Sequence, residues 1–99
     1  MSTFIQLIDY STTRGAEIEA LLDEWRDNTE GRRGTASSVT CRDREQSDHY
    51  VTIVEFPSYE DAMRNNELPE TKQFAARMLE LCEGDPIFVN LDEMRRDKA

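Results

Sequence analysis

The chain has 99 residues, of which 37% are hydrophobic and 33% are charged, and 21 acidic against 12 basic residues give a formal net charge of −9. A chain of this length supports one hydrophobic core, so we expect a single domain over residues 1–99. The negative charge repels phosphate backbones and anionic lipid head groups, which disfavours nucleic-acid and membrane partners. No apolar run approaches the roughly 20 residues of a membrane span and the first residues do not resemble a secretory signal, so we expect a cytoplasmic protein.

The two cysteines point to neither a metal site nor a redox pair. Cys41 and Cys82 lie on different predicted elements without paired spacing. We expect both to be reduced and mostly buried thiols, and we expect no metal.

The first half of the chain contains a strand, a helix and the start of a hairpin. Residues 4–9 form a short, nearly continuous apolar run that is typical of a strand covered on both faces. Residues 11–13 (Ser-Thr-Thr) offer helix caps, and the following helix has one apolar face and ends before Gly31. The spacing of that face is i, i+3, i+4, i+7, and its members are Ile18, Leu21, Leu22 and Trp25.

A turn at residues 31–34 precedes a weaker strand at residues 35–42, which we expect at an edge of the sheet. Residues 43–48 are polar and form the hairpin connection. Residues 49–56 are dense in β-branched and aromatic side chains and are the clearest strand, expected in the middle of the sheet.

The second half contains two helical segments and a last strand. Pro57 ends the preceding strand, and Ser58 with Asp61 resembles a capping box for a short helix reaching Asn65 or Asn66. Pro69 suits the first turn of a second helix, which ends near Gly84. Its apolar stripe consists of Phe74, Ala75, Met78, Leu81 and Cys82. Residues 87–91 form the last strand, and residues 92–99 are a charged tail prone to fraying.

The order βαββαβ predicts an α+β, ferredoxin-like fold with a four-stranded antiparallel sheet and the helices on one face. Strand residues alternate between faces, and one set is purely aliphatic and is expected to meet the helices. That set comprises Ile5, Leu7, Val51, Ile53, Ile87, Val89 and Leu91.

The opposite set is also largely apolar, which predicts a homodimer through the open sheet face. It comprises Phe4, Gln6, Ile8, Tyr50, Thr52, Val54, Phe56, Phe88 and Asn90. Monomers rarely expose so large an apolar patch, so we expect a second copy to cover it and to form a dimeric α+β barrel. Gln6, Thr52 and Asn90 would orient a ligand in its interior, or they would merely satisfy one another.

The chain resembles the dimeric α+β barrel superfamily, especially small proteins of the antibiotic biosynthesis monooxygenase type, over nearly its whole length. The resemblance rests on the strand order and on three sequence features, which are residues 55–62 (EFPSYEDA), Leu68-Pro69 and Phe74. It implies a homodimer and a cofactor-independent oxygenation of a phenolic substrate, chemistry that uses the substrate's own electrons and needs a dry pocket and hydrogen bonds.

The departures from that family restrict the chemistry. The family often has Trp where this chain has Phe56, and His where it has Asn65. Some relatives degrade haem with an Asn, a Trp and an axial His. When this chain is aligned with them on Gly15 and Ser58, those three positions are occupied by Ile8, Asn65 and Ala75. The resemblance therefore implies no haem, and we expect no cofactor.

Several candidate site residues each have a structural alternative. His49, the only histidine, could act as a general base or could simply be exposed at the start of its strand. Tyr50 and Tyr59 could donate hydroxyl groups to a ligand or lie at a rim. Asn65 could face a pocket or, like Asn66, cap a helix end.

For Trp25 and for a group of arginines, a structural role is the simpler explanation than a functional one. Trp25 is expected in the core with its N–H reaching the surface. Arg32 and Arg33, with Arg42 and Arg44 across the turn, could bind an anion, although solvated loop charges are the simpler account.

The leading functional hypothesis is binding of an apolar or aromatic small molecule between sheet and helices, with cofactor-independent monooxygenase activity. Its expected contacts are Gln6, His49, Tyr50, Thr52, Phe56, Asn65 and Asn90. The alternative is a non-catalytic dimerisation or regulatory module whose barrel is filled with side chains.

Overall fold

The computed structural model describes residues 3–32 and 36–98. The strands are β1 (Phe4–Ser11), β2 (Ser37–Arg42), β3 (His49–Phe56) and β4 (Ile87–Asp92). The helices are α1 (Gly15–Asn28), α2 (Tyr59–Glu67) and α3 (Pro69–Leu81). The predicted α+β, ferredoxin-like fold is confirmed.

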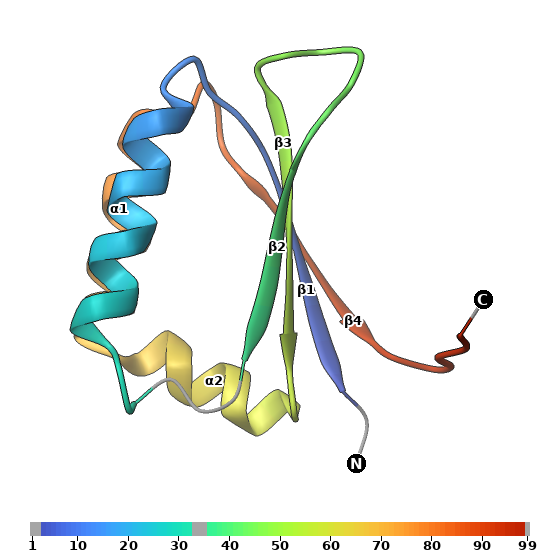
Figure 1. The fold of residues 1–99 in the computed structure, drawn as a ribbon. Helices are drawn as coiled ribbons and strands as arrows, with labels where there is room; N and C mark the ends of the chain where they lie inside the picture. The colour runs from blue at the N-terminus through green and yellow to red at the C-terminus, as the bar shows by residue number, and fades with distance from the viewer. Residues whose placement is uncertain (1–2, 33–35, 99) are drawn as a thin grey trace.

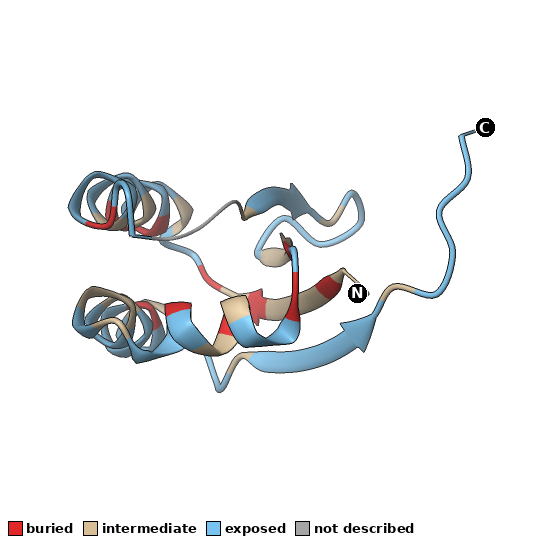
Figure 2. Cartoon of the chain, turned by 90° about the horizontal axis from the view of Figure 1, so that it is seen from below, coloured by how far each residue is buried: buried red, intermediate tan, exposed pale blue. Residues whose placement is uncertain are grey.

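The strands form one antiparallel sheet in the order β2-β3-β1-β4, so β3 is central as predicted. The helices all lie on one side of this sheet and leave the other side open (Figure 1). The open side is visible as the side from which the C-terminal segment extends in Figure 2. None of the helices in the described residues is long and apolar enough to cross a membrane.

The expectation for which sheet face meets the helices is wrong. Phe4 and Phe56 are buried and form a cluster with Ala62 of α2, while Tyr10 is buried with Ile18 and Met78. The face with Phe4, Gln6, Ile8 and Tyr10 therefore faces the helices, and the aliphatic face is open. The reason is that both alternating sets are apolar, so periodicity alone does not select the covered one.

The open face is mainly aliphatic. Its apolar members are Ile5, Leu7, Val39, Cys41, Val51, Ile53, Ile87, Val89 and Leu91, and the register also places Asp9, Ser11, Ser37, His49 and Glu55 on this face. Val39 is 51% exposed and Ile87 is 60% exposed, although both are large apolar side chains. Cys41 is exposed on this face, which contradicts its predicted burial, because no helix covers it. Cys82 is half-buried, and that burial raises the pKa of its thiol.

The helix boundaries follow local signals with one exception. Ser58 caps α2 as predicted, because its Oγ accepts from the Asp61 N–H at 3.2 Å. The predicted cap of α1 within residues 11–13 is wrong: the capping position is Arg14, without a side-chain cap. Thr12 Oγ1 instead accepts from the Arg14 N–H at 2.9 Å and donates to the Leu81 carbonyl at 2.7 Å. It thereby fastens the β1–α1 connection to the end of α3.

Residues 33–35 lie outside the described residues. The expected turn at residues 31–34 and the start of the predicted strand at residues 35–42 are therefore described only in part. Gly31 has φ +82° and Gly84 has φ +80°, in the left-handed region that glycine adopts without strain. Residues 93–98 have no regular secondary structure.

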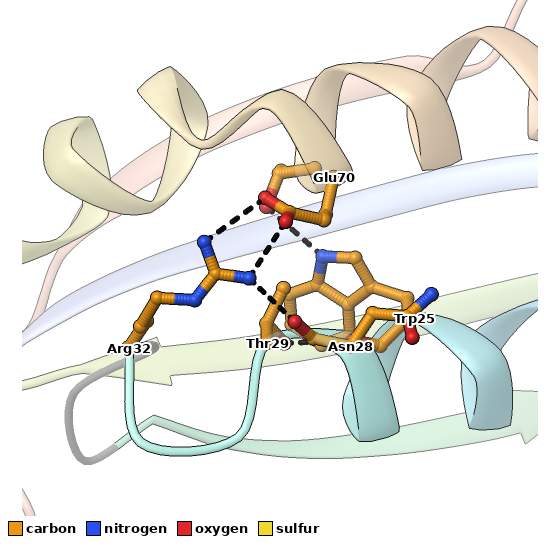
Figure 3. Close-up of polar contacts among 6 residues, drawn as sticks. Trp25, Asn28, Thr29, Arg32 and Glu70 are labelled. Atoms are coloured by element: carbon orange, nitrogen blue, oxygen red, sulfur yellow. Dashed lines mark hydrogen bonds and ion pairs between the residues drawn. The ribbon is translucent and has the colours of Figure 1, made fainter.

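Helices α1 and α3 are joined near the end of α1. The indole N–H of Trp25 donates to Thr71 Oγ1 at 2.9 Å, and the indole lies 5.9 Å from the Phe74 ring. Arg32 forms an ion pair with Glu70 at 2.7 Å (Figure 3). The N–H of Trp25 therefore ends on a neighbouring helix rather than in solvent, and Arg32 is neutralised by a carboxylate rather than presented to an anion.

Candidate ligand-binding site

The helix-facing side of the sheet carries two separate buried clusters with a half-buried region between them. At one end lie Tyr10 and its partners from α1 and α3, and at the other lie Phe4, Phe56 and Ala62. The side chains between the clusters are Gln6, Ile8, Thr52 and Val54, which the register places side by side on β1 and β3. We refer to these four residues as the mid-sheet patch.

The helices do not seal the mid-sheet patch. Its four members belong to the two central strands, yet each is only partly buried. Their neighbours on the uncovered face, such as Leu7 and Ile53, fall in the same intermediate range. Central residues under a well-packed helix layer are normally fully buried. This part of the sheet therefore has surface left for another molecule.

The polar groups of this region come from all four strands. Gln6 Nε2 donates to Asn90 Oδ1 at 3.1 Å across the β1–β4 pair. The Thr52 hydroxyl lies 3.1 Å from Thr40 Oγ1 and 3.4 Å from the Tyr10 hydroxyl. The expectation that Gln6, Thr52 and Asn90 share a face agrees with the register. Each of the three forms a hydrogen bond with a neighbouring side chain, which agrees with the alternative in which these polar groups satisfy one another instead of a ligand.

Asn65 is the exception, because its amide oxygen has no partner. The residue is 8% exposed, and its Oδ1 accepts no hydrogen bond from the described residues. Asn65 follows Ala62 by three positions, which puts both on the same side of α2, and Ala62 packs against Phe4 and Phe56. The side chain thus lies on the sheet-facing side of α2. Asn65 also caps the helix through its backbone, since its carbonyl accepts from the Leu68 N–H at 3.2 Å.

An aromatic pair borders the mid-sheet patch at one end. The Tyr10 and Tyr50 rings are stacked with centroids 5.6 Å apart and an interplanar angle of 10°. Burial raises the pKa of Tyr10, so its phenol stays protonated at neutral pH and acts as a hydrogen-bonding group rather than a base. Tyr10 was not among the predicted contacts because the strand was expected to end at Asp9. Extending the alternation Phe4, Gln6, Ile8 by one step would have included it.

Of the other predicted contacts, Phe56 borders the mid-sheet patch, because Val54 packs against its cluster, whereas His49 lies apart from it. His49 is on the open face, where Nδ1 lies 2.8 Å from Asp43 Oδ2 and Nε2 lies 2.8 Å from Asp9 Oδ1. The hydrogen bonds to Asp43 and to Asp9 raise the pKa of His49. Phe56 is in the cluster with Phe4, and Tyr59 lies at the start of α2 with its ring against Phe4. A general base from His49 is therefore not available to a ligand on the helix side.

A surface groove of about 360 Å³ also runs between α1 and α3. Its lining includes five charged side chains, and an ion pair joins Glu24 to Arg77 at 3.1 Å. A groove with these walls does not suit an apolar ligand, so we favour the mid-sheet patch. The described residues contain no cluster of three or more His, Cys, Asp or Glu side chains suited to a metal ion.

No protein-family model matches the chain, and no curated protein sequence matches it. Solved structures do share its fold. A protein assigned as an antibiotic biosynthesis monooxygenase from Caulobacter crescentus has a TM-score of 0.81 at 13% identity, covering 95% of this chain and 92% of that one. SnoaB, a cofactor-independent oxygenase from Streptomyces nogalater, has a TM-score of 0.81 at 13% identity, covering 97% of each chain. A conserved protein from Methanosarcina mazei has a TM-score of 0.82 at 9% identity, covering 95% of each.

The chain thus has the fold of antibiotic biosynthesis monooxygenase-like proteins, as the sequence resemblance predicted. At these identities the similarity is one of fold, because one fold supports many functions.

Proposed function

We propose that this protein binds a neutral aromatic small molecule between the mid-sheet patch and the helices. The observation that carries the proposal is the buried, unpartnered Oδ1 of Asn65. Leaving a buried acceptor without a donor costs about 1–3 kcal/mol. A ligand hydroxyl or N–H that donates to this oxygen recovers that energy, which gives the ligand one fixed polar group.

The surroundings define the rest of the ligand. The mid-sheet patch has aliphatic and uncharged polar side chains, and the stacked Tyr10 and Tyr50 rings offer an aromatic border. Phe88 of the edge strand β4 pairs with Ile8, so it lies on the same face, and it is 54% exposed. Aromatic rings favour stacking or edge contacts with these side chains. A planar aromatic molecule with a hydroxyl group satisfies both requirements.

We further propose that the bound molecule is oxidised by O₂ without a cofactor, because SnoaB, which shares this fold, is a cofactor-independent oxygenase. For an anthrone, the substrate used in the tests below, the balanced reaction converts the CH₂ between the aromatic rings into a carbonyl. One oxygen atom enters the product, the other leaves as water with the two hydrogens, and the substrate supplies all four electrons. The protein's part is to orient the substrate hydroxyl at Asn65 and to exclude water.

A non-catalytic binding module is the second candidate, and one observation favours it. The polar groups near the mid-sheet patch are amides and hydroxyls, and His49 lies on the opposite face. Oxygen consumption by the protein with an anthrone distinguishes the two candidates, because a binding module leaves the rate of spontaneous oxidation unchanged.

We also propose that the protein is a homodimer joined through its open aliphatic face. Sheets pack face to face about 10 Å apart with their apolar side chains interdigitated. Burial of nine apolar side chains from each copy would remove the exposed patch. The predicted homodimer thus keeps its sheet-face interface but uses the aliphatic set.

The ligand proposal is tested by replacing Asn65. Titration with 1,8-dihydroxyanthrone without O₂, followed by fluorescence quenching of Trp25, measures binding. Asn65→Ala should weaken it about tenfold, since one hydrogen bond near 1.4 kcal/mol is lost. The matched control is Asn66→Ala, because Asn66 is the adjacent amide on the exposed side of α2. Equal affinities for the Asn65→Ala variant and the native protein would refute the placement of the ligand.

A further inference from the structure

The open face carries two carboxylates among its apolar side chains. The register places Asp9 and Glu55 there, on the adjacent strands β1 and β3. Asp9 lies in one row between Val51 and Ile87, which are both apolar members of this face. Its side chain is 45% exposed in the single chain. A second copy that covers Val51 and Ile87 therefore also removes Asp9 from water, and an unpaired carboxylate opposes that burial.

Each of these carboxylates has a cationic partner, but the two partners differ in chemistry. Glu55 pairs with Arg96, whose guanidinium keeps its charge throughout the neutral pH range. Asp9 pairs with His49, since Nε2 lies 2.8 Å from Asp9 Oδ1. Histidine is the side chain whose charge ordinarily changes near neutral pH. The charge balance around Asp9 therefore depends on pH, whereas that around Glu55 does not.

The geometry around His49 matches its protonated form. Nδ1 lies 2.8 Å from Asp43 Oδ2, so both ring nitrogens face carboxylate oxygens. Only the imidazolium has an N–H on each nitrogen, and the neutral ring leaves one of the two carboxylates without a donor. Asp9 comes from β1 and Asp43 from the connection between β2 and β3, and both raise the pKa of His49. The register partner of His49 on β1 is Ser11, which is uncharged.

We propose that protonation of His49 controls dimerisation, because the imidazolium neutralises Asp9 when a second copy covers the open face. This inference rests on the homodimer proposed above and adds its pH dependence. Two carboxylates and one imidazolium give the cluster a net charge of −1, and deprotonation changes it to −2. Two-fold symmetry places two such clusters in each dimer. Association therefore favours protonated His49, and the dimer weakens as the pH rises through the raised pKa.

Sedimentation equilibrium of the full chain at constant ionic strength tests this inference. The dimer dissociation constant should be at least about tenfold higher at pH 8.5 than at pH 6, because deprotonated His49 no longer offsets Asp9. Asp9→Asn removes the carboxylate that the second copy covers, so its dissociation constant should change by less than about threefold over that interval. The matched control is Glu80→Gln, which removes the same charge from α3 on the helix side and should keep the native pH dependence.

A second measurement needs no substitution. His49 is the only histidine, so the imidazole gives a single NMR signal whose titration is followed in the native protein. The titration is repeated at protein concentrations below and above the dissociation constant. The pKa of His49 should be higher at the concentrations at which the dimer forms, because the dimer favours the protonated ring.

The contrary outcomes separate this inference from the dimer proposal. A dimer whose dissociation constant is the same at both pH values, with a pKa of His49 that does not depend on protein concentration, overturns the inference and leaves the dimer in place. A monomer at micromolar concentration at pH 6 overturns both. A folded Asp9→Asn variant that keeps the native pH dependence overturns the role of Asp9. If that variant does not fold, the NMR titration of the native protein decides.

Discussion

At the scale of single residues, the only histidine joins three separate segments. His49 of β3 lies between Asp9 of β1 and Asp43 of the connecting loop, each at 2.8 Å. The alternative in which His49 is simply an exposed residue at the start of its strand missed this arrangement. The reason is that Asp9 and His49 are 40 positions apart and meet only through the β1–β3 register.

This arrangement predicts a pH dependence of stability. The pKa of His49 is raised above its ordinary 6.5, first by Asp43 and then by Asp9, so its contribution is complete below pH 6.5 and is lost as the pH rises through the raised value. The pKa of Asp43 is lowered below 3.8 by the hydrogen bond from His49, so its contribution is complete above that pH and is lost in acid. The pair therefore stabilises the fold most between about pH 4 and 6.5.

The variant His49→Gln should remove the part of this dependence above pH 6.5. We expect the melting temperature of the native protein to fall between pH 6.5 and 8.5, while that of the variant stays nearly constant in that interval. The measurement is a series of thermal melts at constant ionic strength. Parallel pH profiles for the two proteins would contradict the assignment.

At the scale of elements, the start of α1 is fitted against the sheet through a glycine. A Cβ atom on Gly15 would lie 2.7 Å from the Tyr50 hydroxyl oxygen and 3.2 Å from Cζ of that ring. The Tyr50 ring is stacked on buried Tyr10 and has little freedom to withdraw. In the sequence, Gly15 served only to align the chain with the family. The contact with Tyr50 was not predicted, because it joins the start of a helix to the start of a strand 35 positions away.

We therefore expect Gly15→Ala to destabilise the protein by about 1–3 kcal/mol, as overpacking does in cores. In a Tyr50→Phe background the closest contact is absent, and the same change should cost less or even stabilise, because Ala favours helices over Gly by up to about 1 kcal/mol. Urea unfolding of the four proteins measures this coupling. Additive effects of the two substitutions would show that the contact does not limit stability.

At the scale of the whole molecule, the proposed homodimer rests on the apolar side chains exposed on the open face. Val89→Asp places a charge on this face at a side chain that is already 40% exposed, so the domain itself should still fold. We expect sedimentation equilibrium to show a monomer at concentrations at which the native protein is dimeric, with a dissociation constant raised at least a hundredfold. The matched control is Leu79→Asp on the helix side, which should leave the dimer intact. Equal dissociation constants for the native protein and Val89→Asp would contradict an interface on this face.

The sequence by itself determined the elements and their order. The alternating and 3.6-residue apolar patterns, the Ser58 cap and Pro69 located all four strands and three helices, because these signals act over a few residues. It also determined that both faces of the sheet are apolar, which is the origin of the dimer prediction. The predicted contacts Gln6, Thr52 and Asn90 fell on one face because the register follows from strand alternation.

Only the tertiary structure decided which face the helices cover. Ile5 and Leu7 alternate with Phe4 and Ile8, and both sets have a favourable free energy of burial, so local pattern does not choose between them. Packing of the helices selects the covered face, because Ala62 of α2 packs against Phe4 and Phe56, and α1 and α3 pack against Tyr10. The same packing buries Asn65 without a partner and turns His49 to the open side. These contacts join residues far apart in the chain, and only the folded arrangement brings them together.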